Sequence, residues 1–341
     1  MAGRSFADYD ESDVRIRPGK GSRPRSKNRP SHDDAEFGLV VAKDRGRWGV
    51  VLDSGPRVQC TRARELKRTS IEVGDRVGVV GDTSGGKDTL ARIVKREERT
   101  SVLRRTADDT DPFERIIVAN AQLLLIVVAA ADPPPRTGFV ERALIAAFVG
   151  GVTPVVCVTK SDLADPSDFE RELADMGVEV LRTGVEDGVE ALRALIAGRV
   201  SALIGHSGVG KSTLVNRIVP DADRETGEVS GVGKGRHTST QSVALEVPGG
   251  GWIIDTPGIR SFGLAHVSPE EIVDVFPDLE EAAQRCPRGC THLGPPADPE
   301  CAWDELDPAS PVGRRAAAVR GLLAALHSNN DWELKQLDEC R

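Results

Sequence analysis

The sequence lacks an apolar run long enough to cross a membrane, because LLLIVVAAA, which starts at Leu123, has only nine residues. It lacks a secretion signal, because its first residues are polar and charged without an apolar segment. It has no basic excess either: 45 Lys and Arg against 53 Asp and Glu leave a net charge of −8, so any RNA contact must come from a local basic patch. Six cysteines, three of them clustered with a histidine, indicate a reducing compartment and a metal site rather than a disulfide framework. We therefore expect a cytoplasmic protein that does not enter a membrane.

The length of 341 residues predicts two or three domains, and changes in composition suggest their boundaries. Residues 1–34 are predicted to be a disordered basic arm, since residues 14–30 hold seven Lys or Arg and no acidic residue. The arm is either a solvated tail or a contact to phosphate backbone. Residues 35–100 hold five short alternating runs between Gly and Asp turns, which predicts a closed barrel of the oligonucleotide-binding (OB) type, either RNA-binding or purely structural.

Residues 101–265 have the pattern of a doubly wound α/β domain. A charged linker around RRTADDTDPFER leads into near-continuous apolar runs, which are typical of buried parallel strands. The six runs are AQLLLIVVAAAD, TPVVCVTKSD, GVEVLRTG, SALIGHSG, QSVALEVPG and GWIIDTPG. Helices are expected between them at Phe139–Phe148, Asp168–Met176, Val189–Ile196 and Lys211–Ile218.

Residues 266–341 are predicted to be a helical, zinc-binding segment. One helix should begin at Ser268, with Pro269 in its first turn and Glu271 completing a capping box. A second Ser-Pro start at Ser310 opens a longer helix. That helix should place Val319, Leu322, Leu323 and Leu326 on one face.

The segment GHSGVGKST has the full spacing of a phosphate-binding loop, and it lies between a predicted strand and a predicted helix. Its backbone N–H groups can surround phosphates at the N-terminus of the helix. Lys211 should reach the β- and γ-phosphates, and the Ser212 hydroxyl should coordinate Mg²⁺. The residues predicted to contact nucleotide here are Gly205, His206, Ser207, Gly208, Val209, Gly210, Lys211, Ser212 and Thr213.

Two further segments complete a predicted guanine nucleotide site. In DTPG, Asp255 can hold Mg²⁺ through water, and the N–H of Gly258 can contact the γ-phosphate. In TKSD, Asp162 can accept from the ring N–H and the exocyclic amine of guanine, donors that adenine lacks, while the stem of Lys160 lies along the base. Thr159 stands where Asn is usual, which predicts one lost amide contact and a lower affinity for guanine.

The order of these segments is unusual, because TKSD precedes the phosphate-binding loop. A circular permutation accounts for this order, since a nucleotide site at the carboxyl ends of strands keeps its geometry when the chain is cut elsewhere. LRTG, at Leu181–Gly184, then falls where the last base-contacting loop belongs. The agreement of these features favours GTP over ATP.

From about Phe37 onward the sequence resembles the circularly permuted GTPase family of late small-subunit maturation, the RsgA or YjeQ type. GRHTST at Gly235–Thr240 resembles its first switch, and GCTHLGP near Gly289 resembles its metal segment. The resemblance implies an α/β circularly permuted P-loop GTPase with an N-terminal OB-like barrel and a C-terminal zinc-binding helical segment. It also implies a monomer that binds the small ribosomal subunit and its rRNA. Hydrolysis of GTP to GDP would be stimulated by the subunit and coupled to maturation and release.

The catalytic group differs from that of Ras-like GTPases. Gly258 is followed by Ile259 and Arg260, so the Gln that orients the attacking water is missing. The resemblance implies that His237 handles the water beside Lys211 and Asp255, although His237 could instead only order its loop. One of Thr238, Ser239 and Thr240 should give Mg²⁺ a second hydroxyl; the site assignment includes Thr238 and Thr240.

Cys286, Cys290, His292 and Cys301 supply the three sulfurs and one imidazole of a closed structural Zn²⁺ site. Compared with the family, the first gap is one residue shorter and the last is lengthened by GPPAD, so free thiols remain an alternative. Two other functions also stay open. One is a non-catalytic, GTP-dependent rRNA-binding module, and the other is a P-loop ATPase or kinase, which TKSD and DTPG disfavour.

Overall fold

The computed structural model describes residues 31–86, 89–106, 114–135, 137–220, 242–256, 263–264 and 266–339, with the backbone alone from residue 328. The described residues from Asp34 onward belong to one compact unit. The predicted basic arm up to residue 30 lies outside them, as do His237, Thr238, Thr240 and Gly258.

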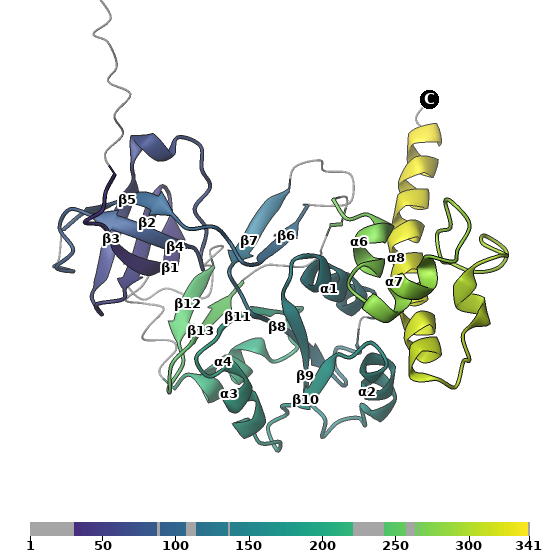
Figure 1. Cartoon of the computed structure of the whole chain (residues 1–341). Helices are drawn as coiled ribbons and strands as arrows, with labels where there is room; N and C mark the ends of the chain where they lie inside the picture. The colour runs from purple at the N-terminus through teal and green to yellow at the C-terminus, as the bar shows by residue number, and fades with distance from the viewer. Residues whose placement is uncertain are drawn as a thin grey trace, which may run out of the picture. The chain divides into compact units, whose positions relative to one another are not determined.

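The N-terminal part is a closed five-stranded barrel (Figure 1). Its strands follow the order β1-β2-β3-β5-β4, and β4 pairs back with β1; only the β3–β5 pair is parallel. Alternating residues such as Val40, Val50 and Ile93 are fully buried inside it. This is the predicted OB-like barrel. The strands are β1 (Glu36–Asp44), β2 (Arg47–Leu52), β3 (Arg57–Arg62), β4 (Arg76–Val80) and β5 (Ala91–Arg96).

A buried ion pair fixes the loop that precedes β4. Asp75 is completely buried, and its carboxylate accepts two hydrogen bonds from Arg99, at 2.7 Å each, beyond the end of β5. The same carboxylate accepts from the backbone N–H of Glu72 at 2.7 Å. The pair therefore joins the barrel to the segment that leads out of it.

The central sheet has the order β10-β9-β8-β11-β13-β12. Five strands are parallel as predicted, but the edge strand β12 runs antiparallel to β13. The prediction of six parallel strands is wrong at this point, because only Val247–Gly251 joins the two strands and a parallel crossover needs a much longer connection. The strands are β8 (Leu123–Ala129), β9 (Thr153–Thr159), β10 (Glu179–Arg182), β11 (Val200–Ile204), β12 (Val243–Glu246) and β13 (Trp252–Asp255).

Helices cover both faces of this sheet, as Figure 1 shows. Along β8, every residue is buried, and alternate side chains enter different cores. Leu124 and Ile126 join the core that contains α1, whereas Leu123 and Leu125 join the core that contains α3 and α4. All four helices lie close to their predicted positions: α1 (Thr137–Val149), α2 (Ser167–Ala174), α3 (Glu190–Ile196) and α4 (Lys211–Ile218).

A hairpin stands where the sequence suggested a charged linker. β6 (Val102–Arg105) and β7 (Arg115–Ala119) pair antiparallel on either side of the charged residues. Leu103 and Val118 are fully buried. Each strand buries so few residues that no alternating pattern stands out in the sequence.

The C-terminal part packs its helices against α1 and holds the cysteine cluster. At α6 the predicted capping box is present: the N–H of Glu271 donates to Ser268 Oγ at 3.3 Å, and the N–H of Ser268 donates to Glu271 Oε2 at 2.8 Å. In α8 the four predicted apolar residues from Val319 to Leu326 are all buried. The elements are α6 (Pro269–Val273), α7 (Pro277–Ala283), the short 3₁₀ helix η4 (Ala302–Glu305) and α8 (Pro311–Glu339). Among the described residues, no helix has the length and apolarity required to span a bilayer.

Candidate nucleotide site and metal centre

The phosphate-binding loop connects β11, in the middle of the sheet, to the start of α4. Gly205, Gly208 and Gly210 in this loop all have a positive φ, and two of them illustrate why glycine is needed. A Cβ on Gly205 would be 2.5 Å from the carbonyl oxygen of Val127, and Gly210 caps α4 with a φ of 94°. The loop therefore brings its backbone close to β8 and presents the N-terminus of a helix, which attracts anions.

Lys211 is the first residue of α4, and its ammonium turns back over the loop. Nζ donates to the carbonyl of His206 at 2.7 Å and also to that of Gly205. Burial lowers the pKa of Lys211, and the nearby carboxylate of Asp255 opposes that shift. The side chain is thus placed where phosphate oxygens can take over from the loop carbonyls.

Asp255 ends β13, next to β11, and its carboxylate is incompletely satisfied. Its Oδ1 is buried with no hydrogen-bond partner among the residues that the structure describes. Burial raises the pKa of Asp255, against the opposing effects of Lys211 and the N–H of Thr256. A buried carboxylate oxygen without a partner fits a hard cation or its water, which is what Mg²⁺ would supply. Ser212 and Thr213, also predicted to contact nucleotide, are exposed in the first turn of α4.

Thr159 ends β9 and contacts the phosphate-binding loop directly. Its buried hydroxyl is 2.5 Å from the carbonyl oxygen of Val209 and 3.3 Å from that of Val128. Thr159 Oγ1 would also be 3.5 Å from a Cβ on Gly210. The structure therefore gives Thr159 a role that the sequence did not indicate, namely to hold this loop against the end of β9.

The next residues of the TKSD segment lie in a turn that follows the carboxyl end of β9. Lys160 has a left-handed backbone with a φ of 54°, and its Nζ donates to the carbonyl of Asp132. Asp162 is exposed, which suits a carboxylate that receives a base from solvent. Thr159 at the end of β9, the phosphate-binding loop after β11 and Asp255 in β13 thus lie at the carboxyl ends of parallel strands in one sheet.

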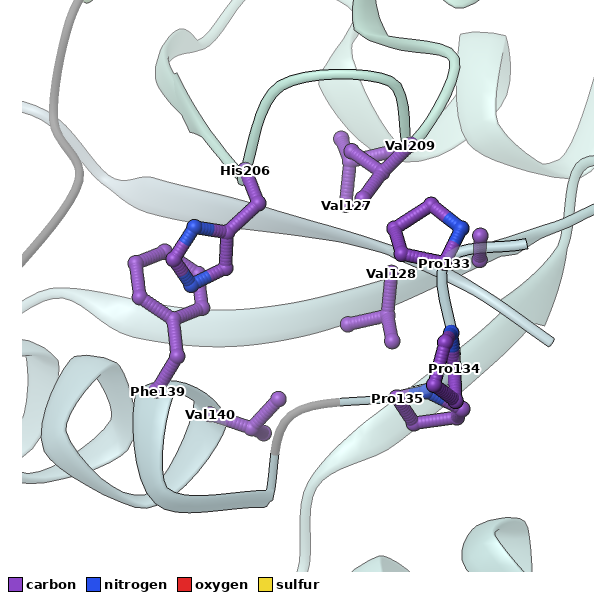
Figure 2. A pocket seen from close by; sticks show the side chains of 10 residues that line it. Val127, Val128, Pro133, Pro134, Pro135, Phe139, Val140, His206 and Val209 are labelled. Atoms are coloured by element: carbon purple, nitrogen blue, oxygen red, sulfur yellow. The ribbon is translucent and has the colours of Figure 1, made fainter. Parts of the chain in front are cut away.

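The imidazole of His206 packs against the first helix of the α/β domain. Figure 2 shows the ring against Phe139 of α1, with a centroid separation of 4.3 Å and an interplanar angle of 53°. Both residues line a small apolar pocket together with Pro133, Pro134 and Val209. The carbonyl of His206 accepts a hydrogen bond from Lys211.

A network around Asp187 and Arg217 was not found from the sequence. Asp187 Oδ2 accepts from the hydroxyl of Ser161 and, at 2.9 Å, from the N–H of Gly184. Arg217, on α4, donates to backbone carbonyls of the loop Thr183–Asp187. Backbone acceptors have no sequence signature, so a basic residue in the last turn of α4 was the only available signal.

The four predicted metal ligands converge in the C-terminal part. Their ligand atoms all lie within 4.8 Å of one another. His292 Nδ1 lies 3.6 Å from the sulfurs of both Cys286 and Cys290, and 3.8 Å from that of Cys301. Tetrahedral Zn²⁺ bonds of ~2.3 Å to sulfur and ~2.1 Å to nitrogen place S and N about 3.6 Å apart, so these residues fit zinc.

The surroundings of the cluster also favour coordination of a metal cation. Burial raises the pKa of Cys290 to about 12 and also raises that of Cys286, so these thiols need a cation to become thiolates. Burial lowers the pKa of His292, which keeps its imidazole neutral and able to coordinate. The ring of His292 also stacks on Trp303 with a centroid separation of 4.6 Å.

The inserted GPPAD segment is an ordered part of this centre. The carboxylate of Asp298 accepts from the N–H of Thr291 at 3.1 Å, from the N–H of Leu293 at 3.0 Å and from the Thr291 hydroxyl. These bonds close the loop that carries His292. The longer gap before Cys301 is therefore accommodated by its own hydrogen-bonded turn.

The strand order completes the description. The phosphate-binding strand β11 lies at the centre, and the strand that carries TKSD, β9, precedes it in the chain but lies two places away in the sheet. This arrangement, with Lys211 and Asp255 at one edge, defines a P-loop GTPase whose chain is circularly permuted.

Comparisons with known proteins give its family. The sequence model of the family described as RsgA GTPase matches residues 96–265. The chain is 35% identical over 297 residues to the small ribosomal subunit biogenesis GTPase RsgA of Gemmatimonas aurantiaca, covering 83% of this chain and 95% of that protein. The crystal structure of YjeQ from Thermotoga maritima matches with a TM-score of 0.62 at 25% identity, over 84% of this chain and 98% of that one. YloQ, described as a circularly permuted GTPase, shares the fold with a TM-score of 0.60 at 22% identity, over 88% of this chain and 98% of that one. The chain belongs to the RsgA GTPase family.

Proposed function

We propose that this protein is a GTPase that binds the small ribosomal subunit and couples GTP hydrolysis to late subunit maturation and to release of itself or of another factor. The observation that carries the proposal is the buried Oδ1 of Asp255, which has no hydrogen-bond partner within the described part of the chain, together with the nearby Lys211 ammonium at the phosphate-binding loop. Relatives named small ribosomal subunit biogenesis GTPase support the choice of partner.

The phosphate groups of GTP would lie on the N-terminus of α4. The ammonium of Lys211 would leave the carbonyls of Gly205 and His206 and contact the β- and γ-phosphates. Ser212 and Asp255 would hold Mg²⁺, Asp255 through water, and the metal would neutralise charge on the phosphates. Two observations support this assignment: Ser212 is exposed, and Oδ1 of Asp255 accepts no hydrogen bond from any residue that the structure describes.

The base would bind at the TKSD turn. Asp162 would accept from the ring N–H and exocyclic amine of guanine, and the stem of Lys160 would cover one face of the ring. Adenine offers neither donor in that arrangement, so a desolvated Asp162 would reject ATP.

The attacking water would be oriented by His237, because Ile259 at the usual Gln position has no hydrogen-bonding group. Thr238 or Thr240 would add a hydroxyl ligand to Mg²⁺, and the N–H of Gly258 would contact the γ-phosphate. His237, Thr238, Thr240 and Gly258 lie outside the described residues, and their proposed roles rest on the family relationship.

The metal centre would hold one structural Zn²⁺ through Cys286, Cys290, His292 and Cys301. We further propose that the OB-like barrel and this zinc segment contact rRNA, and that the protein is a monomer in solution. The chain runs from DTPG directly into the C-terminal segment, so loss of the γ-phosphate could move that segment without an intermediary.

GTP turnover measured alone, with isolated small subunits and with isolated large subunits tests the proposal. We expect slow hydrolysis that small subunits, and not large subunits, accelerate. Nucleotide binding without turnover under all three conditions would favour a non-catalytic rRNA-binding module. Equal turnover of ATP and GTP would instead favour a P-loop ATPase or kinase.

A further inference from the structure

Arg217 joins the phosphate-binding helix to the loop Thr183–Asp187. It lies in the last turn of α4, the helix that Lys211 begins. Its Nη1 donates to the carbonyl oxygens of Thr183 at 2.9 Å and Gly184 at 2.6 Å, and its Nη2 donates to the carbonyl of Asp187. One guanidinium therefore holds three backbone acceptors of a single loop.

These bonds fix the direction of the peptide groups in the loop. The described cis peptide bonds lie elsewhere, at Pro133 and Pro296, so the peptides between Thr183 and Val185 are trans. In a trans peptide the N–H points opposite to the carbonyl. Because both carbonyls face Arg217, the N–H groups of Gly184 and Val185 face away from α4. The N–H of Gly184 accordingly donates to Asp187 Oδ2 at 2.9 Å.

The side toward which these N–H groups point is occupied by the TKSD turn. The hydroxyl of Ser161 donates to the same Asp187 oxygen, so Asp187 bridges the two segments. The approach is close: a Cβ on Gly184 would be 2.6 Å from Ser161 Oγ and 3.4 Å from the backbone nitrogen of Lys160. Val185, by contrast, is an exposed residue, with 75% of its surface accessible.

We propose that Arg217 and Asp187 are positioning residues for base recognition, which hold the Thr183–Asp187 loop so that the N–H of Val185 is directed at the C6 carbonyl of guanine. The proposal rests on the GTP site proposed above. Guanine carries an acceptor at C6 where adenine carries an amine donor. A fixed N–H donor therefore binds one base and opposes the other, and a donor free to rotate loses that discrimination.

The chemistry of the guanidinium suits this task. Its planar fork offers five N–H donors in fixed directions, whereas a lysine ammonium is a single point on a flexible stem. Because Arg217 and Lys211 lie on the same helix, α4 would place the phosphates and the base-reading loop on one rigid element.

The test compares Arg217→Ala, Arg217→Lys and the exposed control Arg171→Ala, which removes the same charge from α2 and leaves the loop untouched. Dissociation constants are measured for GDP, ADP and inorganic tripolyphosphate. We expect Arg217→Ala to weaken GDP about tenfold, with ADP and tripolyphosphate within about twofold of wild type, because misplaced recognition groups cost affinity only for the ligand they recognise. Arg217→Lys should restore part of the loss, and Arg171→Ala should resemble wild type.

A second variant, Asp187→Ala, keeps the test decisive if Arg217→Ala does not fold. It should lower the preference for GDP over ADP while tripolyphosphate binding is retained. Wild-type preference for GDP in both variants, or an equal loss of GDP and tripolyphosphate, would overturn the proposed positioning role. A wild-type protein that does not prefer GDP to ADP would instead contradict the GTP site itself, so the two failures are distinguishable.

Discussion

At the scale of single residues, Thr159 shows how a substitution in a motif can exchange one contact for another. The usual Asn is absent, yet the Thr159 hydroxyl binds the carbonyl of Val209 in the phosphate-binding loop. The residue therefore links the end of β9 to the backbone of the phosphate-binding loop.

Thr159→Val removes this hydroxyl with little change in shape. We expect it to weaken GDP binding about three- to tenfold, since one buried hydrogen bond contributes about 0.5–1.5 kcal/mol. Titration with GDP measures the effect. Thr159→Ser keeps the hydroxyl and should bind nearly as tightly as wild type; an unchanged affinity in Thr159→Val would show that the contact is dispensable.

Asp255→Asn should separate stability from activity. In the nucleotide-free protein burial raises the pKa of Asp255, so the folded state binds this proton more tightly than the unfolded chain does. This tighter proton binding stabilises the folded state below the ordinary carboxyl pKa. The stabilisation is lost as pH rises through the raised pKa. At neutral pH, Asn should therefore raise the free energy of unfolding, on the order of 1 kcal/mol, the scale for an unpaired buried polar group.

The same variant should lose most Mg²⁺-dependent GTP turnover. Thermal unfolding without nucleotide, followed across pH, and turnover at several Mg²⁺ concentrations measure the two effects. A variant that is less stable than wild type at neutral pH would contradict the account of a buried carboxylate whose Oδ1 has no partner in the described structure.

His237→Ala tests the proposed handling of water. We expect turnover to fall at least about tenfold, the lower range for loss of a general acid–base group, while GTP affinity stays within about threefold. Single-turnover hydrolysis and equilibrium binding provide the two measurements. If turnover is unchanged, His237 only orders its loop.

The positions of Lys211 and Asp255 near one another could be predicted because the motifs that contain them have a fixed spacing after strands, whereas their roles stay predictions. The contacts of Arg217 and Asp187 could not be predicted, because their partners are mainly backbone carbonyls and an N–H group, which every residue possesses. The direction of the His206 imidazole was equally inaccessible, since it depends on the packing of α1.

At the scale of elements, the buried pair Asp75–Arg99 holds the barrel to the chain that leaves it. Removing one partner of such a pair leaves an uncompensated buried charge. Arg99→Ala should therefore lower the free energy of unfolding by about 3–5 kcal/mol. Urea denaturation measures the loss.

The exposed pair Arg171–Asp168 supplies the control. Arg171→Ala should change stability by less than about 1 kcal/mol, as is typical of surface ion pairs. Similar losses in the two variants would show that the Asp75 carboxylate finds another partner when Arg99 is removed.

Most elements could be predicted from periodicity, and the exceptions have physical causes. The runs of β8 and β9 are buried on both faces, so their composition alone indicates central strands. The direction of β12 is encoded instead by the short connection Val247–Gly251. The hairpin β6–β7 gave little signal because its strands are four and five residues long and partly exposed.

At the scale of the whole molecule, the Cys/His cluster that could hold a metal lies in the C-terminal part, in contact with the core that contains α1. Cys290→Ser should reduce bound zinc from about one per chain to well below half, since a structural site needs four ligands. It should also lower the unfolding temperature and the stimulation by small subunits, with little change in basal turnover.

Metal analysis, thermal unfolding and turnover with subunits check these expectations. Cys157→Ser changes a buried cysteine outside the cluster, so this variant protein should bind as much zinc as wild type. Wild-type protein purified without chelator that holds less than about half a zinc per chain would contradict the metal assignment.

The central position of β11 affects how this protein is made. β8, β9 and β10 are synthesised first, yet the free edge of β8 is filled only when β11 arrives, through pairs such as Leu123–Ser201. A nascent chain therefore carries an unpaired, apolar strand edge, the kind of surface that chaperones protect. Because Asp255 is translated later still, the proposed Mg²⁺–GTP site would be assembled only when the sheet is nearly complete.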